Sequence, residues 1–507
     1  MKKLLMLFLV VLLTVNFYAQ SKSPEKDSVA AKTENAKPEK SVTRHSITID
    51  GKIISYTAIA GTFIINDDKD EPEASIGYTA YLMDNVKDAT KRPISFAFNG
   101  GPGSSSVWLH MGALGPKRIE TSDASPTPPP PYKIVDNKFS ILDKSDLVMI
   151  DPVGTGFSKA VGKKKDADFW GVDSDIKSVS QFILQYTSEN GRWNSPKYLI
   201  GESYGTTRAA GIVDYLQTNK GMSFNGVVLV SSAMDLGALF DGERPYPFFL
   251  PTFAAVSWYH HLLPKQPEKL EPFLDEVRKY ALGTYSVALM EGDKISDALR
   301  DSVAEKIHEF TGLSVEYVKK ANLRVRESEY TQEMLRDKGE TIGRYDARFT
   351  GVTFDKLAQN AQYDPGEAAF FSAFTAAIYN YLHDDLKFGE GKTYHIFGDL
   401  TGWDMKHIVP GHGTQNVVNT CVDLAHAMKY NTSLKVLVLQ GYFDLATPFF
   451  ATEYMVNHLD LNKKLQPNIA IKYFPTGHMM YLHEPSLEKM KSEIGGFIDS
   501  TDRLNSN

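Results

Sequence analysis

One segment, YLIGESYGTTRAAGIVDYL at residues 198–216, constrains the fold more than any other part of this chain. A short apolar run leads into the motif GESYG, and a helix-like run follows it. The glycines allow a sharp turn between a strand and a helix, which exposes the hydroxyl of Ser203 at the helix N-terminus. Serine is also a common helix cap, so a catalytic interpretation needs support from the rest of the chain.

Short apolar runs that are typical of buried strands recur along the sequence. They are Ile94–Phe98, Leu147–Ile150, Tyr198–Ile200, Val227–Val230, Val436–Leu439 and Ile469–Phe474. Several precede glycine-rich turns and helix-like stretches, and this alternation predicts a largely parallel sheet covered by helices. Residues 54–66 and 74–84 alternate in polarity around the segment NDDKDEPE, which predicts an antiparallel hairpin.

Residues 240–397 have a different pattern, with helical stretches such as KISDALRDSVAEKIHEF and few strand signals. Because the sheet pattern resumes afterwards, we expect this segment to be an inserted, mainly helical cap. The sheet-forming core would then consist of residues 42–239 and residues 398–507.

The first 41 residues are expected to lie outside the folded core. Lys2 and Lys3 precede an apolar run that ends near residue 15, and Ala19 is a small residue suited to a cleavage site. This pattern predicts a signal peptide over 1–19, although a buried N-terminal helix or an uncleaved anchor is the alternative. Residues 20–41 are rich in Lys, Glu, Ser, Ala and Pro and predict a disordered linker. We therefore expect a secreted or periplasmic protein with no stable membrane association after cleavage.

Charge and cysteine content narrow the function classes. The formal net charge is −7, whereas nucleic-acid-binding proteins usually carry an excess of basic residues. We therefore expect no binding to nucleic acid. Cys421 is the sole cysteine, so an intramolecular disulfide is impossible. It lies in an amphipathic, helix-like stretch, where a lone cysteine is usually a small buried apolar residue rather than a nucleophile.

A serine nucleophile needs a base, and the base needs an orienting acid. In folds with a G-x-S-x-G turn, these residues follow in the order serine, acid and histidine, at the ends of late strands. The segment VLVLQGYFDLATP places Asp444 after one strand, and IKYFPTGHMMYLHEP places His478 after the next. The cap explains the long separation of Ser203 from Asp444. His483 is an alternative base, but it lies further from the strand end.

The segment ISFAFNGGPGSSS suggests how an oxyanion is bound. Gly100, Gly101 and Gly103 follow a strand and allow backbone N–H groups to approach a reacting carbonyl. The alternative is a glycine-rich turn that only joins a strand to a helix. The sharp turn at Ser203 and the two residues after the late strands, Asp444 and His478, favour the oxyanion-binding role. His407 and His412 lie in a Gly/Pro loop without metal-ligand spacing, so no metal is expected.

Five motifs give the chain a resemblance to the serine carboxypeptidase family, peptidase family S10. They are FNGGPGSSS, IDPVGTGFS, GESYG, GYFDLATP and PTGHMMYLHEP, in the order found in that family and spanning residues 94–485. The extension GESYGTTRAA resembles the bacterial branch. The resemblance implies an α/β-hydrolase fold and a serine-type carboxypeptidase that hydrolyses peptides with a free C-terminus, through an acyl-enzyme and without a cofactor.

The resemblance also implies a role for each motif residue. Ser203 attacks the carbonyl, His478 acts as general base and then acid, and Asp444 orients His478. The implied oxyanion hole consists of the N–H groups of Gly101 and Tyr204, and the implied carboxylate site of Asn99, Gly100 and Glu202. Two alternatives stay open, namely an esterase or acyltransferase on the same fold, and an inactive binding protein. The oligomeric state stays open as well.

Glu202 is the most informative of these residues, because an ionised carboxylate would repel a substrate carboxylate. In its protonated form Glu202 would donate a hydrogen bond, which implies action at mildly acidic pH. The alternative is that Glu202 has only a structural role in the sharp turn at Ser203. Many family members carry a glutamate before the Leu-Gly-Pro that follows the glycine loop, where this chain has Ala113. The pH dependence is therefore expected to be weaker or shifted. Ser104 also replaces the usual cysteine, without affecting the chemistry.

Overall fold

The computed structural model describes residues 37–399 and 401–504, which belong to one compact unit. The expected signal peptide and most of the expected linker lie outside the described residues. The last two linker positions, Lys40 and Ser41, begin the edge strand β1 (Lys40–Ile49). That strand was hard to recognise because most of its side chains are exposed or half-buried, so its sequence lacks an apolar face.

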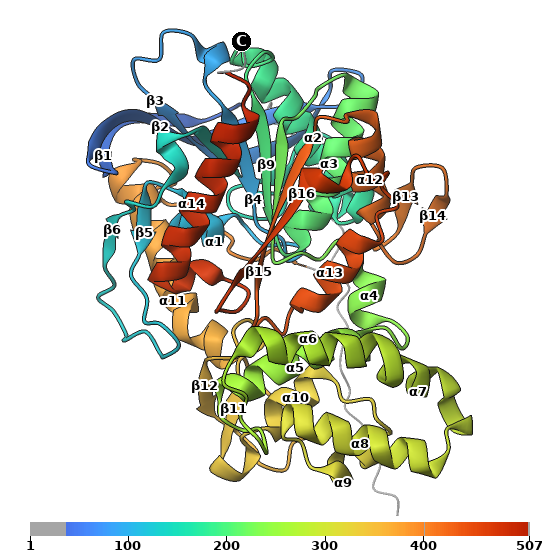
Figure 1. Ribbon diagram of the computed structural model, residues 1–507. Coiled ribbons are helices and arrows are strands. Elements are labelled where there is room, and N and C mark those ends of the chain that lie inside the picture. Colours follow the sequence, from blue (N-terminus) through green and yellow to red (C-terminus); the bar gives the residue numbers. More distant parts are fainter. Residues whose placement is uncertain (1–36, 400, 505–507) are drawn as a thin grey trace, which may run out of the picture. The chain divides into compact units, whose positions relative to one another are not determined.

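A single large sheet forms the centre of the molecule (Figure 1). After β1, its strands in spatial order are β2 (Lys52–Asn66), β3 (Pro72–Met83), β7 (Asp146–Ile150), β4 (Ile94–Phe98), β9 (Lys197–Glu202), β10 (Gly226–Val230), β15 (Lys435–Gly441) and β16 (Ile469–Phe474). The strands from β7 to β16 run parallel, whereas β1, β2, β3 and β7 pair antiparallel. The short β8 (Lys159–Ala160) pairs with β3. The predicted hairpin and parallel strands are confirmed.

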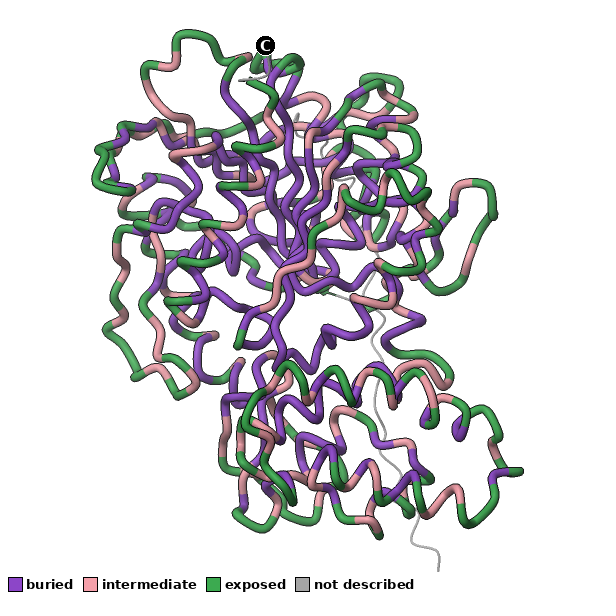
Figure 2. Tube along the Cα trace, in the orientation of Figure 1, coloured by how far each residue is buried: buried purple, intermediate pink, exposed green. Residues whose placement is uncertain are grey.

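Two helical layers cover the sheet. One contains α2 (Val172–Glu189), α3 (Tyr204–Lys220) and α12 (Cys421–Tyr430), and the other contains α1 (Val107–Leu109), α11 (Pro365–Asn380) and α14 (Glu484–Thr501). Because successive strand residues point to opposite faces, Phe96 packs into the first layer and Ala97 into the second. Both faces are therefore buried, and Figure 2 shows the central strands as continuously buried chain.

The predicted insertion is mainly helical, as expected. It contains α5 (Pro245–Tyr259), α6 (Leu270–Tyr280), α7 (Ser286–Glu291), α8 (Asp297–Thr311), α9 (Val315–Lys320), α10 (Glu327–Glu333) and the hairpin of β11 (Glu340–Ile342) and β12 (Thr350–Val352). Tyr330 ties α10 to α5, since its ring stacks on Phe253 with centroids 4.1 Å apart. Its hydroxyl also donates to the carbonyl of Phe253 at 2.9 Å.

One helix of the segment 240–397 differs from the expectation of a cap. Phe370, Phe374 and Ile378 of α11 are buried in the same core cluster as α1 and α14, so α11 belongs to a layer on the sheet. A broad apolar face needs a large apolar partner, and α1 with Trp108 supplies it. The cap boundary at residue 397 stays a prediction.

The remaining α-helices and strands are short, apart from α13. They are α4 (Leu236–Phe240), α13 (Phe449–Asn457), and the hairpins β5 (Lys117–Ile119)–β6 (Ile134–Asp136) and β13 (His407–Val409)–β14 (Gly413–Gln415). In the part of the chain that the structure describes, no helix is both long and apolar enough to cross a bilayer. The loops that follow the parallel strands meet at one edge of the sheet, which is where ligand sites form in such folds.

Candidate active site

Ser203 occupies a strained turn between β9 and α3. Its backbone has φ 59° and ψ −129°, a conformation that residues other than glycine rarely adopt. The turn is held by the N–H of Ser203, which donates to the carbonyl of Val230 on the neighbouring strand at 2.9 Å. The side chain is half-buried and faces a pocket, so the structure confirms the sharp strand–turn–helix predicted from GESYG.

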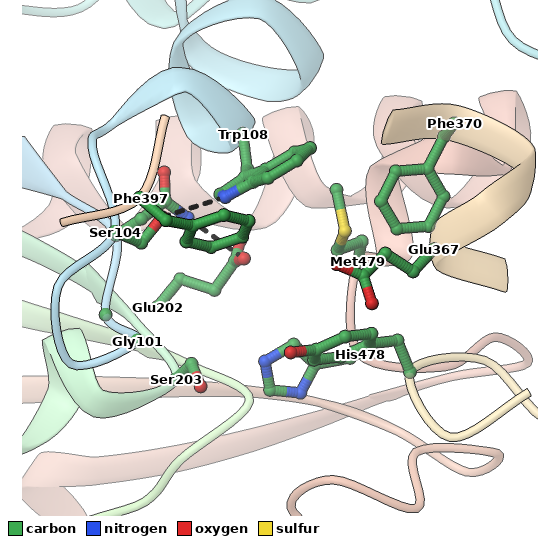
Figure 3. Close-up of a pocket in the computed structure, with 13 residues that line it drawn as sticks. Gly101, Ser104, Trp108, Glu202, Ser203, Glu367, Phe370, Phe397, His478 and Met479 are labelled. Atoms are coloured by element: carbon green, nitrogen blue, oxygen red, sulfur yellow. Dashed lines mark hydrogen bonds between the residues drawn. The ribbon is translucent and has the colours of Figure 1, made fainter. Parts of the chain in front are cut away.

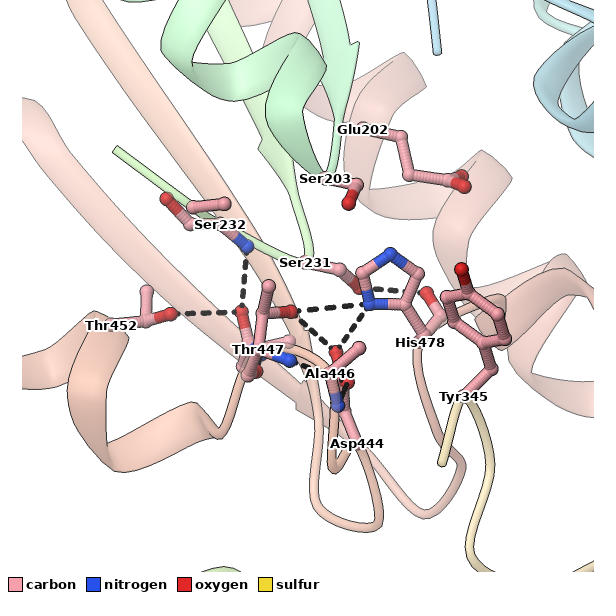
Figure 4. A network of polar contacts seen from close by, with 12 residues as sticks. Glu202, Ser203, Ser231, Ser232, Tyr345, Asp444, Ala446, Thr447, Thr452 and His478 are labelled. Carbon is pink, nitrogen blue, oxygen red and sulfur yellow. Dashed lines mark hydrogen bonds and ion pairs between the residues drawn. The ribbon is translucent and has the colours of Figure 1, made fainter. Parts of the chain in front are cut away.

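His478 and Asp444 lie together beside Ser203 (Figure 4). The Nδ1 atom of His478 lies 2.8 Å from Oδ2 of Asp444, and the Asp444 side chain is fully buried. The hydroxyl of Thr447 donates to the same oxygen at 2.6 Å, and the N–H groups of Ala446 and Thr447 donate to Oδ1 at 2.8 Å. Four contacts therefore occupy the acceptor sites of this carboxylate and fix its orientation. The Ser203 hydroxyl points toward the imidazole.

The backbone around His478 is fixed on two sides. Its N–H donates to the carbonyl of Tyr345 at 2.6 Å, and Ser231 donates its hydroxyl to the carbonyl of His478 at 2.7 Å. Burial lowers the pKa of the His478 imidazole, but the charge and hydrogen bond of Asp444 together with the charge of Glu202 raise it above the usual value. An imidazole with a fixed Nδ1 partner leaves Nε2 available for Ser203.

The glycine-rich loop after β4 packs directly on the turn of Ser203. A Cβ atom on Gly100 would lie only 2.4 Å from the backbone nitrogen of Tyr204, so only glycine allows this approach. Gly101 has φ 102°, in the region that favours glycine. Among the described residues, the N–H groups of Gly101 and Tyr204 have no hydrogen-bond acceptor. Two free donors beside a serine hydroxyl are the arrangement that an oxyanion requires.

Arg208, on α3, binds the backbone of this loop. Its fully buried guanidinium donates to Oδ2 of Asp175 at 2.8 Å and to the carbonyl of Asn99 at 2.5 Å. The carbonyl of Asn99 and the N–H of Gly100 belong to the same peptide group. A cation bound to that carbonyl polarises the peptide, and the N–H of Gly100 becomes a stronger donor.

Glu202 lies in the same pocket as Ser203, with its side chain buried. Its Oε1 atom accepts a hydrogen bond from Nδ2 of Asn99 at 3.0 Å and one from the hydroxyl of Tyr481 at 3.1 Å. Burial raises the pKa of Glu202 to about 7, against the lowering effects of nearby His478 and of the two hydrogen bonds. The carboxyl group is therefore largely protonated at mildly acidic pH.

The pocket between these groups has a polar floor and apolar walls (Figure 3). Ser203, His478 and Glu202 lie around it. The rings of Trp108, Phe370 and Phe397 and the side chain of Met479 supply its apolar lining. Glu367, at the start of α11, also reaches the pocket. Such a concave, mostly apolar site with a few convergent polar groups is typical of a ligand-binding pocket.

The structure brings together most of the residues singled out in the sequence. Asn99, Gly100, Gly101, Glu202, Ser203 and His478 line this pocket, with Asp444 behind His478. The backbone nitrogen of Tyr204 lies against Gly100. The structure thus brings these residues, singled out in the sequence, to one place at the end of the parallel strands.

Three further residues considered in the sequence, His483, Cys421 and His407, lie outside the pocket of Ser203. His483 contacts the hydroxyl of Ser486 at the start of α14, at 2.8 Å. Cys421 is buried at the start of α12, and burial raises the pKa of its thiol. His407 lies between two carboxylates, with Nδ1 2.6 Å from Asp173 and Nε2 2.9 Å from Asp423. None of these three side chains lines the pocket of Ser203.

Several residues of the site were not singled out in the sequence, and Thr447, Tyr481 and Tyr345 show why. Thr447 follows Asp444 by three positions, a spacing at which an aspartate and a threonine often bond locally, so it was recognisable in principle. Tyr481 is part of a quoted motif, but nothing local shows that its hydroxyl reaches Glu202. Tyr345 comes from the cap segment, and no local pattern relates it to His478.

Comparison with known proteins adds an independent line of information. A family model described as serine carboxypeptidase matches residues 71–505. Serine carboxypeptidase-like 29 and 21 of Arabidopsis thaliana are 26% and 28% identical over 129 and 179 residues, which are 24% and 33% of this chain. The pheromone-processing carboxypeptidase KEX1 of Saccharomyces cerevisiae is 28% identical over 125 residues, 24% of this chain. These alignments span 25%, 34% and 16% of the relatives' own lengths.

A solved structure extends the likeness to the fold. The crystal structure of KEX1(DELTA)P, a prohormone-processing carboxypeptidase from Saccharomyces cerevisiae, matches with a TM-score of 0.50. The match covers 88% of this chain and 92% of that chain at 14% sequence identity. At this identity the likeness shows the fold alone, and it confirms the predicted α/β-hydrolase fold with a mostly parallel sheet and helical insertions.

Gly100 gives a direct test of the oxyanion geometry. Substitution of Gly100 by alanine would force the glycine loop away from Tyr204, so we expect labelling of Ser203 by a fluorophosphonate to slow by about 10²- to 10³-fold. The matched control is Gly496→Ala on α14, where a Cβ meets nothing within 4 Å. Equal labelling rates in the two variants would contradict the assignment. Circular dichroism would establish that both variants are folded.

Proposed function

The chain belongs to the serine carboxypeptidase family, and on this premise we propose that it is a serine-type carboxypeptidase. It releases the C-terminal residue of a peptide through an acyl-enzyme intermediate. One observation carries the proposal: the pocket that Ser203 and His478 line also contains Asn99, Gly100 and Glu202. In the last peptide bond of a chain, the reacting carbonyl and the free carboxylate are one residue apart. A pocket that holds both a nucleophile and donors for a carboxylate fits such a substrate.

The first half-reaction forms the acyl-enzyme. Oγ of Ser203 attacks the carbonyl carbon of the last peptide bond, and its proton passes to Nε2 of His478. The N–H groups of Gly101 and Tyr204 donate to the oxyanion that develops. The imidazolium, held by Asp444, then gives its proton to the leaving nitrogen. The C–N bond breaks, and the C-terminal amino acid departs.

The second half-reaction consumes water. A water molecule attacks the ester carbon of the acyl-enzyme and loses its proton to His478, and the same two N–H groups bind the second oxyanion. Collapse of this intermediate returns the proton to Ser203 and releases the shortened peptide. Because water is the co-reactant and the side chains move every proton, the proposed reaction requires no cofactor.

The carboxylate site distinguishes an exopeptidase from an esterase or acyltransferase on the same fold. A terminal carboxylate would accept hydrogen bonds from Nδ2 of Asn99, from the N–H of Gly100 and from protonated Glu202. An esterase has no need for a buried acid beside its nucleophile. The buried, half-satisfied carboxyl of Glu202 therefore favours the carboxypeptidase over the alternatives.

Hydrolysis of N-blocked dipeptides tests the proposal. We expect cleavage at pH 5–7, a loss on the order of 10²-fold in kcat/KM when the substrate carboxylate is amidated, and a loss of roughly 10⁴-fold or more in Ser203→Ala. Cleavage of simple esters without any cleavage of blocked dipeptides from pH 4 to 8 would instead indicate an esterase or acyltransferase. Failure of a fluorophosphonate to label Ser203 would indicate a binding protein.

The pH dependence of KM tests the role of Glu202. Protonated Glu202 binds a carboxylate and ionised Glu202 repels it, so KM for a blocked dipeptide should be flat below pH 6. Above pH 7 it should rise by up to about tenfold per pH unit. Glu202→Gln carries an amide donor at every pH, and its KM should therefore vary little between pH 5 and 8. A KM in Glu202→Gln that still rises with pH would show that another group controls carboxylate binding.

We propose that the protein is exported and that its partners are peptides with a free C-terminus. Support comes from the positively charged, apolar and small-residue pattern of residues 1–19. The segment GESYGTTRAA supports the bacterial branch of the family as its origin, which agrees with a periplasmic or secreted location.

Export has a simple test in a Gram-negative host. The full chain should appear in the periplasmic or extracellular fraction with the mass expected after loss of roughly 19 residues. A variant without residues 2–19 should stay in the cytoplasm. Uncleaved protein in the membrane fraction would indicate an anchor, and uncleaved protein in the cytoplasm would exclude export.

A further inference from the structure

Tyr481 lies three residues after His478 and is almost fully buried. Its hydroxyl donates to Oε1 of Glu202 at 3.1 Å. Its ring packs against Gly112 so closely that a Cβ atom there would lie 2.5 Å from the ring. The tyrosine thus reaches Glu202 through a space that exists because position 112 is glycine.

The two oxygens of Glu202 have unequal environments. Oε1 accepts from Tyr481 and from Nδ2 of Asn99, whereas Oε2 is buried and has no hydrogen-bond partner among the described residues. The orientation of the Asn99 amide is fixed, because its Oδ1 accepts a hydrogen bond from the N–H of Leu109 at 2.9 Å. Rotation of the amide by 180° would lose that hydrogen bond. A carboxyl oxygen that already accepts two hydrogen bonds is the poorer place for a proton. The proton of neutral Glu202 therefore resides on Oε2.

We propose that Tyr481 is a positioning residue for carboxylate recognition. It holds Glu202 so that Oε2 carries the proton and this O–H donates a hydrogen bond to the C-terminal carboxylate of the substrate. The inference rests on the proposed carboxypeptidase function and deepens it. Without the hydroxyl of Tyr481, Oε1 keeps a single donor, so the proton can occupy either oxygen and the carboxyl group can turn away from the pocket.

Position 113, which follows Gly112 in the chain, carries no carboxyl group. Ala113 is small and buried next to Gly112, and the ring of Tyr481 fills the adjacent space. A tyrosine hydroxyl satisfies Oε1 without adding an acid that titrates near neutral pH, since burial raises the pKa of Tyr481 well above its usual value. One carboxyl group, rather than a coupled pair, should then govern carboxylate binding.

The groups around Glu202 bear on its titration. His478, from the loop after β16, favours the ionised form of Glu202, and Asp444, from the loop after β15, disfavours it. Asn99 and Tyr481 favour the ionised form through their hydrogen bonds. Glu367 of α11 also faces the pocket. Loss of the Tyr481 hydroxyl should therefore raise the pKa of Glu202. It should also weaken the hydrogen bond from Glu202 to the substrate carboxylate.

The variant Tyr481→Phe separates these effects, because it keeps the ring on Gly112 and removes only the hydroxyl. For a blocked dipeptide, we expect KM below pH 6 to rise about tenfold with kcat little changed. We also expect the pH at which KM begins to rise to move upward, in line with the higher pKa of Glu202. Hydrolysis of an ester substrate without a free carboxylate should be unaffected.

Two further variants make the test specific. Tyr381→Phe removes an equally buried hydroxyl from the same core cluster, outside the pocket, and should leave both KM and its pH dependence as in the wild type. In a Glu202→Ala background, Tyr481→Phe should add little to KM, because the proposed effect acts only through Glu202. Thermal unfolding of each variant would detect a general loss of stability.

Each result has a defined meaning. An unchanged KM and pH profile in Tyr481→Phe, with an active wild type, would overturn the positioning role. So would equal losses on ester and dipeptide substrates, which indicate general damage to the fold. Additive effects of Tyr481→Phe and Glu202→Ala would overturn it as well. A wild-type protein that cleaves no blocked dipeptide would instead reject the carboxypeptidase function, and that outcome is visible before any variant is made.

Discussion

The parallel pairing of β4 with β9 is the constraint on which the rest of the site depends. The register places Phe98 opposite Gly201, so the loop that begins at Asn99 lies directly beside the turn of Ser203. The two loops then approach until Gly100 contacts the backbone of Tyr204, and Arg208 binds the carbonyl of Asn99 from below. Because this contact joins backbone to backbone, small rearrangements of side chains do not alter it. The strain at Ser203 persists because the surrounding sheet and loop determine its conformation.

The site contains two buried carboxyl groups with opposite environments. Asp444 receives four polar contacts, one of them from the imidazole of His478. Glu202 has two donors on one oxygen and none on the other, and burial raises its pKa to about 7. Pairs of acids whose surroundings favour different protonation states often perform different tasks in one reaction. Here Asp444 holds the proposed base, and Glu202 is proposed to bind the substrate in its protonated form.

Much of the fold was predictable because the parallel strands are buried on both faces and thus appear as continuous apolar runs. The candidate triad and the glycine loop were also predictable, since each follows a strand end. Prediction missed features whose signal was weak or distant. The edge strand β1 has little apolar pattern, and nothing local in α11 showed that its aromatic face packs beside α1. Thr447 was overlooked despite a local spacing that suggests its bond to Asp444.

By itself, the sequence determined the order of strands and helices, the position of the sharp turn at Ser203 and the residues that follow each late strand. These depend on local periodicity and on glycine, which are properties of neighbouring residues. Only the tertiary structure decided the hydrogen-bond partners and the burial that act on Glu202. Burial, the amide orientation of Asn99 and the reach of Tyr481 past Gly112 join segments that lie far apart in the chain. A pKa and a hydrogen-bond geometry arise from such long-range packing, which no local pattern encodes.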